Sequence, residues 1–199
     1  MWCVEDVSRR VKGWTIVPRQ LLEFLRPVAV TVVAAVMIRG FLVAPFYIPS
    51  GSMEPTLTPG DYILVNRFIY FLHPPQRGDI IVFRFPRDEH WDFVKRVIGL
   101  PGDVVEEQDG QMFVNGRSLR EAYVRHSLGG LAPGMSLAPV RIVPRQLFVL
   151  GDNRDASLDS RFWGTVEEHE VIGKAFVIYW SHGEHWWDIR WQRIGRWLG

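Results

Sequence analysis

The sequence predicts a mainly β protein with a single N-terminal membrane-spanning helix. Three observations lead to this fold class: a long apolar run at residues 21–43, short Val-, Ile- and Phe-rich runs beyond it, and no long stretch of helical periodicity after residue 50. At 199 residues the chain can form one domain of ordinary size together with an additional segment.

The apolar run reads "LLEFLRPVAVTVVAAVMIRGFLV" and has about the length that a helix needs to cross a bilayer. Its charges, Glu23, Arg26 and Arg39, lie off-centre, where long side chains can extend toward the interface. Pro27 would kink or start the helix. The alternative is a buried core helix, because the charge-free stretch between the two arginines is short.

Basic residues precede this run, whereas after Arg39 the next one is Arg67. The positive-inside rule therefore places a tail of residues 1–20 in the cytoplasm, a signal-anchor at 21–43, and residues 44–199 across the membrane. A cleavable signal peptide is the competing interpretation. Pro45 directly follows the small residue of the candidate cleavage site and would obstruct a peptidase, which favours an uncleaved anchor.

Beyond the anchor, the sequence predicts an all-β domain of barrel-like or sandwich-like sheets. The strand candidates are separated by Pro, Gly and Asp, and the Asp109-Gly110 and Asn115-Gly116 pairs predict tight hairpins. The candidate strand segments are "DYILVNRFIY", "GDIIVFRFP", "DFVKRVIGL", "DVVEEQDGQMFVNGRSL", "RQLFVLGDN" and "KAFVIYW".

Composition excludes several classes of function. The chain has 23 basic and 22 acidic residues, a net charge of +1, which gives no case for nucleic-acid binding. Cys3 is the only cysteine, so an internal disulfide and a cysteine-based metal site are excluded. No cofactor and no metal is expected. The six histidines lie in loops or among charged and aromatic neighbours, and nothing in the sequence recommends one of them as a triad member, although a Ser-His-Asp arrangement remains an alternative.

The segment "YIPSGSMEPTLTPGDYILVNRF" places Ser50 and Ser52 on either side of one glycine and indicates a reactive serine. A serine needs a base, and Lys95 in "WDFVKRVIGLPGD" is the unusual candidate. Strand alternation puts Phe93 and Val97 on the same face as this lysine. Apolar neighbours disfavour the charged amine and lower its pKa, so that it can accept a proton. A surface lysine whose stem covers the sheet is the alternative.

Four segments resemble, in order, the motif blocks of type I signal peptidases, also called leader peptidases. They are "PSGSMEPTL" (49–57), "RGDIIVFRFP" (77–86), "KRVIGLPGD" (95–103) and "GDNRDASLDSRFWG" (151–164). The resemblance implies a signal-peptidase-type all-β catalytic domain, with Ser52 as nucleophile and Lys95 as general base. It implies that Ser50 and the backbone N–H of Ser52 form the oxyanion hole. The short region 119–146 indicates a reduced cap.

The resemblance also implies supporting and substrate-binding residues. Ser157 is expected to hydrogen-bond the lysine amine, and Asp159 and Arg161 to form a nearby ion pair that holds the loop. Two shallow apolar pockets would accept the small residues of an Ala-x-Ala motif. The first would be lined by Ile48, Pro49, Met53, Leu57, Phe93 and Val94, and the second by Phe46, Ile63, Val82 and Asp92.

The expected partners are the signal peptides of exported preproteins and the lipid bilayer. The protein-export translocon is a further candidate partner. The expected location is the bacterial cytoplasmic membrane, with the catalytic domain on its outer face. The Trp-rich C-terminus, with Arg190, Arg193 and Arg196, suits an interfacial belt, or else a last strand with an aromatic core. A catalytically silent tethered binding protein and a self-cleaving repressor remain as rivals; the latter would need a DNA-binding helix-turn-helix.

Overall fold

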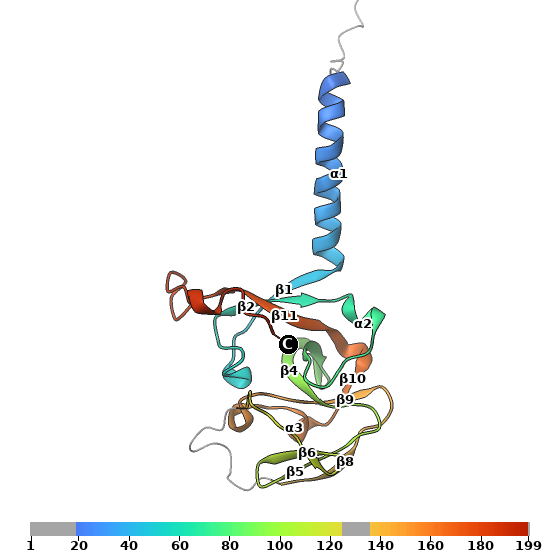
Figure 1. The fold of residues 1–199 in the computed structure, drawn as a ribbon, viewed down its shortest axis with the longest axis vertical. Coiled ribbons are helices and arrows are strands. Elements are labelled where there is room, and N and C mark those ends of the chain that lie inside the picture. The colour runs from blue at the N-terminus through green and yellow to red at the C-terminus, as the bar shows by residue number, and fades with distance from the viewer. Residues whose placement is uncertain (1–18, 125–135, 199) are drawn as a thin grey trace, which may run out of the picture. The chain divides into compact units, whose positions relative to one another are not determined.

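The computed structural model describes residues 19–124 and 136–198. The chain divides into two compact units, residues 1–39 and 40–199. A long helix, α1 (Arg19–Phe41), precedes a β-rich part, in which two antiparallel sheets are connected by β4 and β9 (Figure 1). The mainly β class is therefore confirmed.

Helix α1 coincides closely with the apolar run predicted at 21–43. Pro27 lies inside this helix, and the carbonyl of Pro27 accepts a hydrogen bond from Oγ1 of Thr31 at 2.8 Å. The proline therefore neither begins nor ends the helix. Within residues 19–124 and 136–198, no helix meets the combined requirement of length and apolar content for crossing a membrane.

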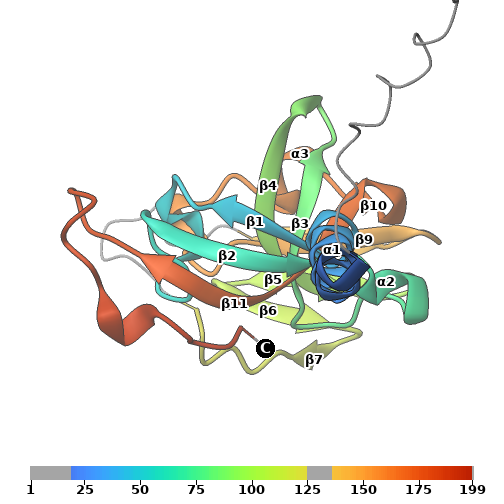
Figure 2. The same cartoon turned by 90° about the horizontal axis from the view of Figure 1, so that it is seen from above.

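The larger sheet contains seven strands in the order β1-β2-β11-β3-β4-β9-β10. Figure 2 shows β1, β2 and β11 side by side along one flank. Val, Ile and Phe dominate the central strand β3, whose first four residues are all buried because both of its faces are covered. The strands are β1 (Val43–Tyr47), β2 (Asp61–Asn66), β3 (Ile80–Phe85), β4 (Asp88–Gly99), β9 (Gln146–Leu150), β10 (Val166–Glu167) and β11 (Val171–Ser181).

The smaller sheet has the order β7-β6-β5-β8, and its strands are β5 (Val104–Gln108), β6 (Gln111–Val114), β7 (Arg117–Ser118) and β8 (Leu137–Arg141). Both predicted hairpins are present. Asp109, Gly110, Asn115 and Gly116 all have positive φ, as tight hairpin turns require.

Short helices connect the strands. They are η1 (Gly51–Met53), α2 (Ile69–Leu72), η2 (Arg154–Ala156), α3 (Ser160–Trp163), η3 (Glu168–Glu170) and η4 (Trp191–Arg193). Two of them, η1 and η2, carry or flank the serines singled out in the sequence.

Three hydrophobic clusters form the core among the described residues. One contains Met53, Leu57 and Ile63. A second groups Phe83 and Val97 with α3 and β9, and a third fills the space under the smaller sheet. Strand β4 contributes to all three clusters, because Val94, Val97 and Ile98 each pack into a different one. This anchoring holds the middle of β4 rigidly.

The C-terminal segment packs on the loop that follows η1. Nε and Nη2 of Arg193 donate to the buried carboxylate of Asp61 at 2.9 and 2.6 Å. Burial alone would raise the pKa of Asp61, but bonds from Arg193, Thr58 and Ser181 hold it below its ordinary value. Arg190 donates to the carbonyl of Pro59 and to Thr58. Arg190 and Arg193 therefore stabilise the fold and do not form an outward-facing basic surface.

Candidate active site

Ser52 lies in the 3-10 turn η1, between β1 and β2. Ser50, at its N-cap, has extended backbone, and the turn closes with the amide of Glu54 donating to the carbonyl of Gly51 at 3.1 Å. Met53 and Leu57 are completely buried on the inner side of the turn. This packing leaves Ser52 half-buried and Ser50 exposed on the outer side.

Lys95 on β4 reaches this turn from the other side. Its Nζ donates a hydrogen bond to Oγ of Ser52 at 2.8 Å, across 43 residues of sequence. The lysine is only 4% exposed, and its amine lies 5.5 Å from the centre of the Phe93 ring. Burial lowers the pKa of Lys95 to about 8, even though the charges of Asp159 and Asp152 act to raise it. The buried amine expected from strand alternation is therefore present beside the serine.

Residues 151–153 form the floor under Ser52. The amide of Asn153 donates to the carbonyl of Ser52 at 3.1 Å, and Nδ2 of Asn153 donates to the carbonyl of Gly51 at 3.0 Å. A Cβ on Gly151 would lie 2.4 Å from the carbonyl oxygen of Ser52. Only glycine allows this close approach of the two backbones.

Ser157 lies at this floor but does not make the contact expected of it. Its Oγ is buried, lies next to Gly151, and has no hydrogen-bond partner within the residues described. The expected hydrogen bond from Ser157 to Lys95 is therefore absent. The amine of Lys95 is directed at Ser52 instead.

Asp159 and Arg161 form the expected ion pair. Nε of Arg161 donates to Oδ1 of Asp159 at 2.9 Å, Nη2 donates to Oδ2 at 3.0 Å, and the carboxylate is completely buried. Arg161 also lies 3.6 Å from Glu107, whose pKa is raised mainly by burial.

A second buried ion pair lies beside Lys95, between Arg96 and Asp152, and it was not predicted from the sequence. Nε and Nη2 of Arg96 donate to the two oxygens of Asp152 at 2.8 and 2.7 Å. Both residues are less than 10% exposed. The available sequence signals were that Arg96 directly follows Lys95 and that Asp152 directly follows Gly151. The sequence did not reveal that these two residues pair, because they are far apart along the chain.

A groove of about 440 Å³ opens over Ser52 and Lys95. Seven of the ten residues expected in the substrate pockets line it: Phe46, Ile48, Pro49, Met53, Asp92, Phe93 and Val94. The other three, Leu57, Ile63 and Val82, are completely buried in the core and do not line the groove. The prediction missed Tyr47, Trp91, Ala156 and Leu158, which complete the lining.

One edge of β4 is open along this groove. Residues 92–95 pair with β3 on one side, whereas β9 pairs with β4 only from Arg96 onward. No described strand occupies the other edge beside residues 92–95. An extended peptide can therefore add to the sheet there, next to the reactive serine.

The rival histidine base finds no support among residues 19–124 and 136–198. No histidine there hydrogen-bonds Ser52, and His90 and His169 pair with nearby carboxylates instead. His126 lies outside the described residues. The same residues contain no group of three or more His, Cys, Asp or Glu placed to hold a metal.

A serine and a buried lysine in contact, at the open edge of a strand, form an arrangement in which the amine can activate the serine hydroxyl. The family follows from comparison. The chain matches the family described as "Signal peptidase, peptidase S26" over residues 21–180. It belongs to this family of serine endopeptidases.

The names of individual relatives agree with this family assignment. "Probable signal peptidase I-2" of Synechocystis is 41% identical over 165 residues, covering 80% of this chain and 73% of that protein. "Signal peptidase I" of Pseudomonas fluorescens is 35% identical over 210 residues, covering 82% and 74% respectively. "Signal peptidase IB" of Staphylococcus aureus is 33% identical over 179 residues, covering 83% and 93%.

Proposed function

We propose that this protein is an endopeptidase that removes signal peptides from exported preproteins, with Ser52 as nucleophile and Lys95 as general base. The observation that carries the proposal is the 2.8 Å contact between a buried lysine amine and the serine hydroxyl, in a chain of the signal peptidase family.

In the first step, neutral Lys95 accepts the proton of Ser52 while Oγ attacks the carbonyl carbon of the scissile bond. The resulting ammonium then gives a proton to the leaving amine as the tetrahedral intermediate collapses to an acyl-enzyme. A water molecule then loses a proton to Lys95 and attacks the carbonyl carbon of the acyl-enzyme. Ser52 leaves with the proton from Lys95, and the product with the new carboxyl end is released. A pKa of about 8 keeps enough amine neutral at neutral pH for this cycle.

Ser50 is proposed to stabilise the oxyanion together with the backbone N–H of Ser52. Its Oγ lies 3.4 Å from Oγ of Ser52 and is exposed to the groove, so it can turn toward an oxygen held beside the nucleophile. One such donor contributes about 2.7–4 kcal/mol to transition-state stabilisation.

Specificity for small residues at alternate positions follows from the free edge of β4. A substrate paired with residues 92–95 presents every second side chain to the groove wall. Met53, Phe93 and Val94 contribute apolar side chains to that wall, and Phe46 and Asp92 also line the groove. Large side chains at the two facing positions would clash with this wall.

The function is tested by incubating the full chain, in detergent, with a fluorogenic peptide that carries an Ala-x-Ala cleavage site. Wild type should cut after the second Ala, and Ser52→Ala should be inactive. A histidine-based enzyme would be revealed by His→Ala variants that abolish cleavage. Cleavage that survives in Ser52→Ala would disprove the proposal.

Helix α1 is proposed to anchor the enzyme in the cytoplasmic membrane, with residues 1–20 inside and 44–199 outside. Its 23 residues correspond to about 34 Å, close to the thickness of a bilayer core. The valines at 28, 30, 32, 33 and 36 are 47–64% exposed and lie on several sides of the helix. A lipid environment would cover this apolar surface, which water does not favour.

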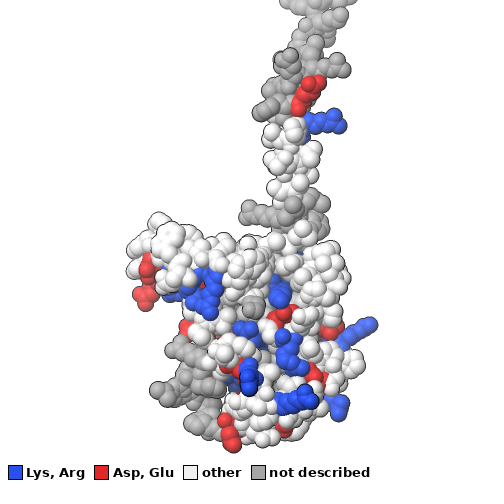
Figure 3. All heavy atoms as spheres, viewed as in Figure 1, with Lys and Arg blue, Asp and Glu red and all other residues white. Residues whose placement is uncertain are grey.

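The C-terminal segment is proposed to lie at the lipid interface. Trp186, Trp187, Trp191 and Trp197 are 63–75% exposed. In Figure 3 the upper side of the lobe that this segment forms is uncharged, whereas acidic and basic side chains lie along its lower side and over the rest of the visible β-rich surface. Exposed tryptophans are typical of proteins that contact lipid headgroups.

A further inference from the structure

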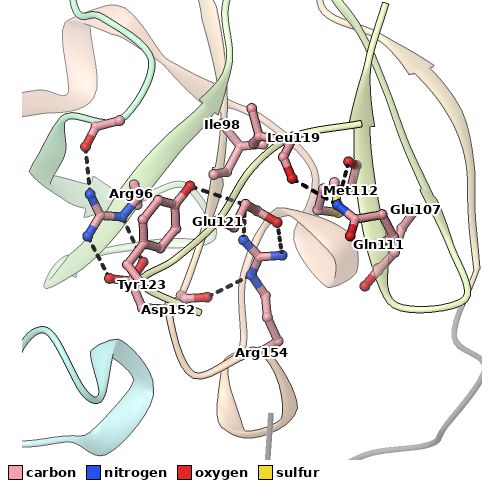
Figure 4. Close-up of polar contacts among 12 residues, drawn as sticks. Arg96, Ile98, Glu107, Gln111, Met112, Leu119, Glu121, Tyr123, Asp152 and Arg154 are labelled. Carbon is pink, nitrogen blue, oxygen red and sulfur yellow. Dashed lines mark hydrogen bonds and ion pairs between the residues drawn. The ribbon is translucent and has the colours of Figure 1, made fainter. Parts of the chain in front are cut away.

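A short segment outside the proposed catalytic residues packs against the charged floor of the site. We call residues 119–124, which follow β7, the strap. At its start, the amide of Leu119 donates to the carbonyl of Met112 at 2.9 Å, and Nε2 of Gln111 donates to the carbonyl of Leu119 at 2.9 Å. Figure 4 shows the strap passing from this anchor to Arg96, Asp152 and Arg154.

Tyr123 covers the ion pair beside the lysine. Cζ of Arg96 lies 3.9 Å from the centre of the Tyr123 ring, while the same guanidinium holds both oxygens of Asp152. Arg96 and Asp152 are 7% and 1% exposed. The aromatic ring therefore forms part of the wall that keeps water from this pair, and its face attracts the cation.

Glu121 binds Arg154, which directly follows the floor residues 151–153. Its carboxylate accepts bonds from Nη1 of Arg154 at 3.0 Å and from Nη2, and it also accepts the hydroxyl proton of Tyr123 at 3.1 Å. Nε of Arg154 in turn donates to the carbonyl of Gly151 at 3.1 Å. The strap is thus connected to the glycine on which the backbone of Ser52 rests.

These contacts bear on the base because Asp152 and Asp159 are the two carboxylates whose charges act on Lys95. Each is neutralised by an arginine: Arg96 holds Asp152, and Arg161 holds Asp159. A looser or wetter Arg96–Asp152 pair would leave more negative charge facing the lysine and would also hydrate its amine. Both changes favour the charged, inactive ammonium.

We propose that Tyr123 and Glu121 are positioning residues for catalysis, which hold the Arg96–Asp152 pair and the 151–154 loop in the arrangement that lets Lys95 lose its proton readily and directs its amine at Ser52. The proposal rests on the Ser52–Lys95 function above. It assigns the strap a role in the protonation of the base, although none of its residues touches the reacting atoms.

The test measures kcat/KM against pH for wild type, Tyr123→Ala and Tyr123→Phe in the full-length enzyme. In wild type, kcat/KM should rise with pH along a limb near pH 8, where Lys95 loses its proton. Tyr123→Ala removes the ring from Arg96 and should move this rising limb upward by about one pH unit, a loss of about tenfold at pH 7 that largely disappears at high pH. Tyr123→Phe keeps the ring and should leave the limb within about 0.3 unit. Tyr179→Ala, a partly exposed tyrosine away from the groove, is the matched control and should not move it.

Glu121→Gln supplies a variant that preserves shape. It replaces the charge-assisted bonds to Arg154 by weaker neutral ones and loosens the strap, so the limb should move upward, in the same direction as for Tyr123→Ala. The removed negative charge acting alone would move the limb downward. A loss of folding alone would lower activity equally at every pH and would move no limb.

The experiment distinguishes a failure of the proposed Ser52–Lys95 function from a failure of the proposed positioning role. If wild type has no limb near pH 8, or Lys95→Arg is active, the Ser52–Lys95 function fails. If wild type has the limb but Tyr123→Ala leaves it in place, or Glu121→Gln moves it downward, the positioning role is overturned. Should Tyr123→Ala not fold, Tyr123→Leu takes its place and the Glu121→Gln result decides independently.

Discussion

Replacing Lys95 by methionine should abolish turnover and, at neutral pH, make the folded protein more stable. The lysine is 4% exposed, and its pKa is lowered from 10.5 to about 8, chiefly by burial. At about 1.36 kcal/mol per pKa unit, the folded protein loses about 3 kcal/mol by holding this amine charged. Methionine has a similar length and carries no charge.

The sign of the pH dependence follows from proton binding. Between about pH 8 and 10.5, the unfolded chain holds more protons on this lysine than the folded protein does, so wild-type stability rises with pH in this window. Below about pH 8 the cost is present in full. Methionine also loses the hydrogen bond to Ser52, worth about 1 kcal/mol, which leaves a net gain of about 2 kcal/mol at pH 7.

The assay is urea unfolding of both full-length proteins in detergent micelles, followed by tryptophan fluorescence at pH 7 and above pH 10.5. The free energy of unfolding of Lys95→Met should exceed that of wild type at pH 7, and the difference should vanish or reverse at the higher pH. A variant no more stable than wild type at pH 7, or one whose advantage is the same at both pH values, would refute the assignment of a costly buried amine.

Three further predictions concern the site and the anchor. Ser50→Ala should lower kcat by about 10²–10³ whereas Ser52→Ala abolishes it, and equal losses in single-turnover assays would mean that the two roles are misassigned. Gly151→Ala places a Cβ 2.4 Å from the carbonyl oxygen of Ser52 and should lower kcat about 10²-fold. Gly99→Ala, which collides with core side chains instead, should cost stability but spare the kcat of the folded enzyme. Protease added to vesicles with the cytoplasmic side outward should remove only the N-terminal tail, and digestion after residue 44 would contradict the proposed orientation.

Local patterns were sufficient for much of the fold. Strands β2 and β3 were recognisable because β-branched and aromatic residues recur between turn residues, and both hairpin turns were recognisable because Asp-Gly and Asn-Gly tolerate positive φ. Strand alternation placed Lys95 with Phe93, and the two lie in contact. These inferences succeeded because they depend on neighbours within a few residues along the chain.

Other features required the tertiary structure. The sequence could not reveal that Leu57, Ile63 and Val82 are core residues rather than pocket residues, because apolar residues suit either place. The resemblance implied a hydrogen bond from Ser157 to Lys95, but the Ser157 hydroxyl has no hydrogen-bond partner among the described residues. The sequence also suggested a basic outward face for Arg190 and Arg193, which instead bind the loop after Ser52.

The sequence by itself determined which residue types could carry the chemistry, since a serine turn and a lysine between apolar strand residues are local facts. Only the tertiary structure decided that Ser52 meets Lys95 at 2.8 Å, that Arg96 neutralises Asp152 under Tyr123, and that β9 leaves one edge of β4 open. Each of these contacts joins segments tens of residues apart. Which segments meet depends on how the strands pair and how the core side chains pack. The free energy of that packing comes from the whole domain, so no single segment of the sequence determines it.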